Sequence, residues 1–312
     1  MSGPGSTTVA YAEESGGYLS GPAADPSYVL PGEDTSFDDL SIDNQLSAIS
    51  APDSTLPKRQ LAGNFEGGFG ASWTLNSMSP QPWHDLIFPR DSDGSGTRDA
   101  YDGDGSFPSS EWYVSVAQPD GTVTERVLQG VVITSVSWEW SPDSPPEVSM
   151  TGVYGNERSE AAVTPGTIDR PDGAVPAHGA TLTYATEDKA AKLQSATLSV
   201  ENIAQLQRGA SRFPVDVVEG APQVELEIEK IYETSTQLEY AYETAGATQA
   251  ASDTLDSASA ALTFDYEGTT VADYTLSGTK PNSLGWNQVP PGEDENVTET
   301  ITLQGTDIQA SA

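Results

Sequence analysis

The chain has 312 residues, with 47 Asp and Glu against 13 Lys and Arg, a formal net charge of -34 and no Cys. Without cysteine there can be no disulfide, thiolate metal site or cysteine nucleophile, and so acidic a chain repels the phosphates of nucleic acid. No apolar run approaches the ~20 residues of a membrane-spanning helix. Residues 1–10 lack the basic and apolar regions of a signal peptide. We therefore expect no membrane span or export signal, and either two domains or one large one.

The acidic composition has two interpretations. A chain with high net charge and few apolar residues can stay disordered, because it buries too little surface to offset its conformational entropy. Alternatively, a folded protein adapted to very high salt tolerates many carboxylates, since mobile ions screen them to within a few ångströms. Six Trp, twelve Tyr and seven Phe fall mostly in periodic segments, and only five residues are Lys. These features favour a folded, halophilic protein.

Most of the predicted elements are strands. Residues 1–36 are rich in Gly, Ser, Pro and acids, which predicts an extended arm that is ordered only where something packs against it. After the arm come short segments with period-two alternation, rich in β-branched and aromatic residues and bounded by Gly, Pro and Asp. Clear examples are 112–116, 131–138, 197–200 and 224–228.

Two short helices interrupt the strands. Residues 79–88 begin with Ser followed by Pro80, the pattern of an N-cap with proline in the first turn, and they stop before a second proline. Residues 234–246 place apolar side chains at helical spacing and end in Gly. The small-residue segment 250–260 is either a third helix or a loop. We therefore expect a mainly β protein with one short helix in each half.

The same order of segments occurs twice. Residues 40–44 resemble 198–202, and the Leu-Gln-Gly of 128–130 resembles the Leu-Ser-Gly of 276–278, in each case about 150 residues later. The two predicted helices are separated by a similar interval. A shared order with a near-constant offset indicates a tandem duplication. The predicted organisation is an arm (1–36), a first domain (37–156), a connector (157–190) and a second domain (191–312).

Carboxylates are too abundant for a pair of them to indicate catalysis. Alternation in the strand around 224–228 places Glu225, Glu227 and Glu229 on one face and the apolar residues between them on the other. A solvated strand face explains this arrangement better than an active site does. Around a ring of chains, the same face would line an acidic channel.

The remaining candidates for catalysis are weak. His84 lies in the first predicted helix and His178 in the connector, and a histidine in such a place more often packs or is solvated than catalyses. The sequence has no zinc-protease, serine-hydrolase, P-loop or dinucleotide-binding motif in its required setting. We therefore do not expect an enzyme.

Residues 91–102 match the spacing of a 12-residue calcium loop. The candidate ligands are Asp91, Asp93, Ser95, Asp99 and Asp102, with Gly96 at the sharp turn. Position 12 usually holds Glu, however, the next segment is predicted as a strand, and loops of this composition are common in acidic proteins. A site for Ca²⁺ or another divalent cation and a plain solvated loop are both compatible with the pattern, and no other cofactor is indicated.

The layout of the chain resembles a known family. Residues 61–69 lead through 73–75 into the first short helix, then a long loop and a hairpin whose return strand is 128–136. In the second half, 196–202 ends in Glu-Asn and is followed by 213–232. In this order the chain resembles the tail tube (major tail) proteins of long-tailed double-stranded DNA viruses. The similarity covers the layout of residues 37–310 and does not rest on one diagnostic motif.

The resemblance implies two tandem β-sandwich domains, each with one short α-helix and a long hairpin. It also implies a structural role in the virion tail, with stacked rings that conduct DNA in transit and contact tape-measure, neck and baseplate proteins. Single-domain family members form hexamers, so a duplicated chain would form a trimeric ring with pseudo-sixfold symmetry; a hexamer is the alternative. An acidic lumen would let DNA slide without sticking. The composition implies a halophilic archaeal host, with assembly in its cytoplasm.

Two other classes of function remain open. A head decoration, neck or baseplate protein would share the β-sandwich fold and the acidic composition. A surface adhesin or carbohydrate-binding module of a halophile would also be β-rich. The adhesin alternative requires export and a surface cluster of aromatic residues, whereas the aromatic residues here lie mainly in alternating strands, the helices and the arm.

Overall fold

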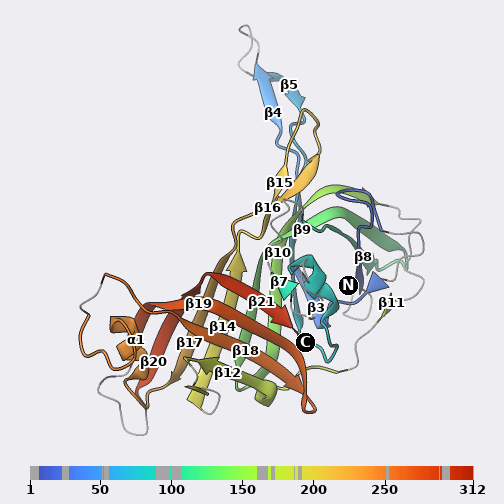
Figure 1. Cartoon of the computed structure of the whole chain (residues 1–312). Coiled ribbons are helices and arrows are strands. Elements are labelled where there is room, and N and C mark those ends of the chain that lie inside the picture. Colours follow the sequence, from blue (N-terminus) through green and yellow to red (C-terminus); the bar gives the residue numbers. More distant parts are fainter. Residues whose placement is uncertain are drawn as a thin grey trace.

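The structure is a computed structural model that describes residues 7–22, 28–50, 52, 56–88, 98–99, 107–159, 168–169, 173–185, 187–188, 192–250, 253–287, 289 and 296–311. These residues form mostly β-strands, arranged in a sandwich-like fold (Figure 1). The described part contains one α-helix, α1 (Thr236–Tyr242), and two 3-10 helices, η2 (Pro82–Leu86) and η3 (Ala177–Gly179). The predicted mainly β class is confirmed. None of the described helices is long and apolar enough to span a membrane.

The first half of the chain forms an antiparallel arrangement in the order β3–β6–β10–β9–β8–β1. Its strands are β1 (Thr7–Glu13), β2 (Tyr28–Val29), β3 (Glu33–Asp43), β4 (Ser47–Ser50), β5 (Pro57–Leu61), β6 (Glu66–Thr74), β7 (Arg98–Asp99), β8 (Ser110–Ala117), β9 (Val123–Ser141), β10 (Ser144–Ser159) and β11 (Ile168–Asp169). The predicted arm is thus partly ordered: β1 pairs with β8, and Tyr11 stacks on Trp112 with ring centroids 5.0 Å apart.

The second half repeats this order as β14–β17–β20–β19–β18–β12. Its strands are β12 (Ala180–Tyr184), β13 (Glu187–Asp188), β14 (Leu193–Glu201), β15 (Ala204–Gln207), β16 (Asp216–Glu219), β17 (Gln223–Ile231), β18 (Ala258–Tyr266), β19 (Thr269–Asn287), β20 (Thr298–Gly305) and β21 (Asp307–Ser311). Each half also has a hairpin. The β4–β5 hairpin lies between β3 and β6 in the chain, and the β15–β16 hairpin lies between β14 and β17.

The two longest strands share a local distortion. β9 and β19 each have 19 residues, and each is bulged opposite its shorter partner. The bulge contains Gly130 in β9 and Gly278 in β19, both with φ of 62°. Glycine adopts this left-handed conformation without a steric penalty, and a bulge lets a strand turn from one layer into another. The repeated Leu-x-Gly sequence therefore marks the same structural feature twice.

One sheet and one core join the halves. The end of β9 pairs with β14 in an antiparallel register in which Trp138 lies opposite Leu198. The sheet therefore runs without a break through β3–β6–β10–β9–β14–β17–β20–β19. Buried side chains from both halves form one hydrophobic cluster. Within it, the rings of Trp138 and Tyr274 have centroids 4.5 Å apart, and His84 Nε2 lies 2.8 Å from the hydroxyl of Tyr274.

The helices differ from the prediction in detail. The first is a 3-10 helix of five residues and not an α-helix, and it begins at Pro82 after an extended Gln81. A proline restricts the residue before it to extended conformations, so the helix starts later than the Ser–Pro pattern indicates. The second helix follows Ser235 as predicted but ends at Tyr242. Segment 250–260 is no helix where it is described, since residues 258–260 begin β18.

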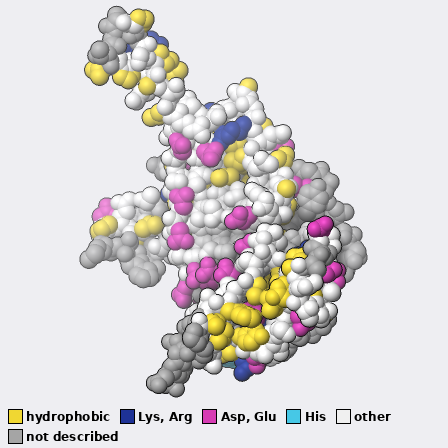
Figure 2. Space-filling view, turned by 90° about the vertical axis from the view of Figure 1, so that its left-hand side faces the viewer, with side chains coloured by type: hydrophobic (Ala, Val, Ile, Leu, Met, Phe, Trp, Pro, Cys, Tyr) yellow, Lys and Arg dark blue, Asp and Glu magenta, His cyan; other side chains and the backbone are white. Residues whose placement is uncertain are grey.

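A narrow projection extends from the body. It consists of the β4–β5 hairpin, and the β15–β16 hairpin lies beside its base (Figure 1). The ring centroids of Phe65 and Phe213 are 5.7 Å apart, and Arg208 pairs with Glu66. Figure 2 shows hydrophobic and basic side chains together on the outer part of this projection. We call residues 46–61 the hairpin arm.

Candidate functional site: a polar sheet face and two open strand edges

The eight-stranded sheet has one apolar and one polar face. Its apolar face packs into the core, with Trp138, Leu198, Leu226 and Leu303 nearly inaccessible to solvent. The cross-strand registers place the intervening residues together on the opposite face. We call this set the polar face: Asp39, Ser41, Ser72, Thr74, Ser135, Ser137, Glu139, Glu147, Ser149, Thr151, Ser195, Thr197, Ser199, Glu201, Glu225, Glu227, Glu229, Lys280, Ser283, Thr300, Thr302 and Gln304.

The three glutamates of β17 lie near the centre of the second half of the polar face. Glu227 is exposed, and Glu225 and Glu229 are half-buried, whereas the residues between them are buried on the other side. The predicted alternation is therefore present. Each glutamate lies between hydroxyl or amide side chains: Glu227, for example, is flanked by Thr197 and Thr302. None of the three glutamates therefore has another carboxylate directly opposite it on a neighbouring strand.

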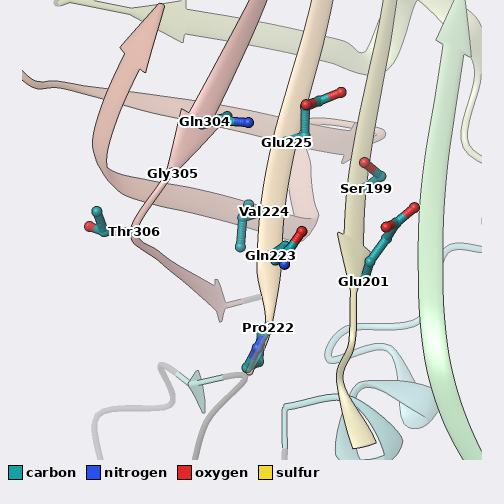
Figure 3. Close-up of a pocket in the computed structure, with 9 residues that line it drawn as sticks. All are labelled: Ser199, Glu201, Pro222, Gln223, Val224, Glu225, Gln304, Gly305 and Thr306. Atoms are coloured by element: carbon teal, nitrogen blue, oxygen red, sulfur yellow. The ribbon is translucent and has the colours of Figure 1, made fainter. Parts of the chain in front are cut away.

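One end of the polar face is hollowed. The hollow has a volume of about 510 Å³ and lies over the ends of β14, β17 and β20. In Figure 3, Ser199 and Glu201 of β14 lie beside Gln223 and Glu225 of β17, with Gln304 on the next strand. Most of the side chains that line the hollow are polar or acidic. Such a surface is suited to water and small ions and not to an apolar ligand.

Two strands of this sheet have an edge without a strand partner in the described structure. β3 pairs only with β6, and residues 280–287 of β19 pair only with β20. Each edge exposes a large apolar side chain: Ile42 is 48% exposed on β3, and Trp286 is 46% exposed on β19. Unpaired edges and exposed apolar residues are features that proteins usually cover.

Trp286 lies next to a tyrosine ring and a buried ion pair. Its ring contacts Tyr232 with centroids 5.1 Å apart, and its Nε1 lies 3.4 Å from Glu299 Oε1. Glu299 is fully buried, and its Oε2 forms an ion pair with Lys230 Nζ at 2.9 Å. The side chain of Lys230 is also buried. The counterparts in the first half are apolar: Val148 takes the place of Glu299, and Trp73 takes the place of Lys230. The ion pair is therefore specific to the second half.

The structure separates the two histidines. His84 is buried in η2 against Trp83 and Tyr274, and its contact with the Tyr274 hydroxyl joins the two halves. Burial raises the pKa of Tyr274 far above its ordinary value, so that this hydroxyl stays protonated. His178 is exposed in η3. Neither histidine is part of the polar face.

The candidate cation loop lies mostly outside the described residues. Asp91, Asp93, Ser95 and Asp102 lie outside the described residues, and Asp99 is described only as part of β7, opposite Gln309 on β21. Among the residues that are described, no three His, Asp or Glu side chains are arranged to hold a metal ion.

Some features of the site escaped the sequence interpretation. The pairing of β9 with β14 and the open edges depend on contacts between distant segments. The hairpin arm carried a local signal, because Leu46, Ile49, Leu56 and Leu61 lie in a segment that also contains Lys58 and Arg59. The structure places all four leucine and isoleucine side chains of this segment at the surface.

A comparison with models of protein families finds a match to this chain. The model of a family described as phage tail tube protein matches residues 6–305, which is nearly the whole chain. A search of curated proteins found no match.

Proposed function

The chain belongs to the phage tail tube protein family, and from this premise we propose that its copies close into rings which stack into a non-contractile tube that conducts viral DNA into the host. Membership of the family makes it a structural component of a virion tail that assembles with other virion proteins. The role we propose for it is structural and not enzymatic.

The observation that carries this proposal is the polar face. It is continuous over eight strands and combines small hydroxyl residues with carboxylates, among them Glu139, Glu147 and Glu227. Lys280 is the single cation in the set. Duplex DNA carries one negative charge per ~1.7 Å of its length, so a wall of this kind repels it and offers few groups that could hold a phosphate. We assign this face, including Glu225, Glu227 and Glu229, to the lumen.

The internal repeat supports a trimeric ring. Both halves have the same strand order and the same glycine bulge, which fits two tube domains in one chain, at 37–156 and 191–312. Three chains would then supply six similar units, giving pseudo-sixfold symmetry. A hexamer of chains is the alternative. Rings of either kind would satisfy the open edges without leaving a strand free.

The proposal also covers the neighbouring proteins in the tail, the host and a candidate cation loop. Tape-measure, neck and baseplate proteins are the expected neighbours in the tail, and assembly would take place in the host cytoplasm. The net charge of -34 and the scarcity of lysine fit a virus of a halophilic archaeon. The segment 91–102 stays a candidate loop for Ca²⁺.

Electron microscopy of the purified protein in molar salt, with mass determination of the smallest ring, tests the proposal. Hollow rings or tubes with three chains per ring would support the tube and the duplicated-domain symmetry. Six chains per ring would retain the tube and reject the pseudo-sixfold arrangement. A monodisperse monomer that never stacks would reject ring assembly and favour a head-decoration or adhesin role.

A further inference from the structure

The chain contains an internal example of how two of its units join. Residues 135–140 of β9 pair antiparallel with 196–201 of β14, the first sheet strand of the second half. In this junction Trp138 lies opposite Leu198, and Val136 lies opposite Val200, all on the apolar face. The polar residues between them continue the polar face.

The repeat assigns a counterpart to each side of this junction. β3 corresponds to β14, since Leu40 lies opposite Phe69 of β6 as Leu198 lies opposite Leu226 of β17. β19 corresponds to β9 through the shared bulge, and this alignment places Trp286 at the position of Trp138. The two counterparts are the two strands with open edges. One chain thus has half of the junction at each end of its sheet.

We propose that β3 of one chain pairs antiparallel with β19 of a second copy, in the register of the β9–β14 junction. Leu40 would lie opposite Trp286 and Ile42 opposite Leu284, with Ser41 opposite Gly285 and Asp43 opposite Ser283 on the polar side. This inference rests on the proposed function, because it names the contact that closes the ring. It goes further in fixing which strands meet and in which register.

Side-chain direction supports this register. Leu40 and Ile42 are on the apolar side of β3, and Leu284 and Trp286 are on the apolar side of β19. The proposed pairing brings these four together and buries the exposed Ile42 and Trp286 side chains. A slip by one residue would turn the apolar residues of one strand toward the polar face. The proposed register therefore continues both faces of the sheet.

Charge supports a head-to-tail contact between the two different edges. β3 carries Glu33, Asp34, Asp38, Asp39 and Asp43. Residues 280–287 contain Lys280 and no Asp or Glu. Pairing two copies of β3 with each other would set carboxylates against carboxylates, which destabilises a strand pair. Pairing β3 with β19 avoids this repulsion, and a head-to-tail contact of this kind generates a ring when the rotation between copies closes.

Side chains of the neighbouring strands fix β3 in place. The carbonyl oxygens of Leu40 and Ser41 accept hydrogen bonds from Arg126 Nη1 at 2.9 Å and from the Tyr154 hydroxyl at 2.8 Å. These donors belong to β9 and β10, so the bonds hold β3 against the body. A carbonyl oxygen has two lone pairs and can accept a second bond from an incoming strand.

Disulfide trapping tests the register, because the chain has no cysteine of its own. Ser283→Cys combined with Asp43→Cys places directly opposed cysteines across the proposed contact, where Cα separations of about 4.5–5.5 Å permit a disulfide. The matched control is Ser283→Cys with Asp39→Cys, four residues out of register and hence about 13 Å away. A second in-register pair is Ser41→Cys with Gly285→Cys, where a Cβ at Gly285 meets no atom within 4 Å.

We expect both in-register pairs, oxidised after assembly, to give covalent multimers that end at the number of chains in the ring, with a yield more than about tenfold above the control. A mixture of the two single variants should stop at covalent dimers. Rings seen by microscopy that crosslink only in the control pair, or in none, would overturn the register and leave the tube function intact. Protein that forms no ring while reduced, and no crosslink once oxidised, would overturn both the register and the tube function.

Discussion

At the scale of single residues, the buried ion pair between Lys230 and Glu299 makes the fold sensitive to mutation of either partner. Both side chains are buried, with Nζ and Oε2 2.9 Å apart. Removing one partner from such a pair leaves an uncompensated buried charge. The corresponding pair in the first half, Trp73 opposite Val148, is apolar, so an apolar replacement of both partners has a precedent in this fold.

The first prediction is that Lys230→Met lowers the free energy of unfolding by about 3–5 kcal/mol. Chemical denaturation of the wild type and the variant at neutral pH measures this loss. The double variant Lys230→Met with Glu299→Leu should recover most of it, since no charge is then left buried. If the double variant were less stable than Lys230→Met, the buried charge would not be the cause.

The second prediction concerns Glu157 in β10. Burial alone would raise its pKa, but hydrogen bonds from Arg126 and Tyr154 outweigh this and hold the pKa of Glu157 below its ordinary value. The Arg126 Nε–Glu157 Oε1 distance is 2.6 Å. A folded-state pKa below the unfolded one gives a contribution to stability that is present above the unfolded pKa, near 4.5, and is lost as pH falls through the folded value.

Glu157→Gln should therefore destabilise the protein at pH 7 by about 1.5–3 kcal/mol, the range for a hydrogen bond to a charged group. The difference from the wild type should shrink steadily between pH 5 and pH 3. Urea denaturation of both proteins across this interval provides the measurement. A difference that stayed constant with pH would show that the carboxylate charge contributes nothing.

At the scale of elements, the hairpin arm is the part least able to stand alone. An isolated two-stranded hairpin is at best marginally stable in water. Its side chains Leu46, Ile49 and Leu61 are 63%, 46% and 51% exposed. Lys58 and Arg59 add positive charge to the same element of an acidic protein. These features suit an element that docks on the acidic surface of another copy.

The third prediction is that Leu46→Ser, Ile49→Ser and Leu61→Ser together prevent rings from stacking and leave single rings intact. The reason is that the apolar surface of the arm contacts the next ring in the proposed tube. Electron microscopy of tube length and sedimentation of the smallest ring distinguish the two levels. Val123→Ser, which removes another exposed apolar side chain from β9, is the matched control and should leave tube length unchanged.

The elements also show what sequence patterns can and cannot predict. Alternation predicted the strand around 224–228 and the face of Glu225, because residue-by-residue alternation reports directly on the two sides of a strand. The Ser–Pro pattern misplaced the start of the first helix, since Pro82 dictates an extended Gln81. The junction between β9 and β14 gave no local signal at all, because its partners are far apart in the sequence.

At the scale of the whole molecule, the two halves form one body. They share the sheet through β9 and β14 and share the core through Trp138, Tyr274 and His84. The tandem repeat was visible in the sequence as short matches such as the Leu-x-Gly of 128–130 and 276–278. The continuous core was not visible, because a domain boundary inferred from composition carries no information on what packs across it.

The continuous sheet makes the polar face a property of the assembly, and its charge leads to the fourth prediction. In the proposed tube the face lines the lumen, so reversing the charge of β17 with Glu225→Lys, Glu227→Lys and Glu229→Lys should turn a repelling wall into one that binds DNA. Each lysine could neutralise a phosphate and release a counterion, and binding should therefore weaken steeply as salt rises. The same three positions changed to Gln test loss of charge alone.

Cosedimentation of short duplex DNA with assembled tubes, at several salt concentrations, measures this effect. We expect no binding by the wild type, little by the Gln variant, and binding by the Lys variant that disappears at high salt. The three glutamates of β17 are flanked by Ser, Thr and Gln side chains across the sheet and point away from the core, so three lysines can be placed without altering the buried Val224, Leu226 and Ile228. Intact tubes of the Lys variant that bind no more DNA than the wild type, even at low salt, would place the polar face away from the lumen.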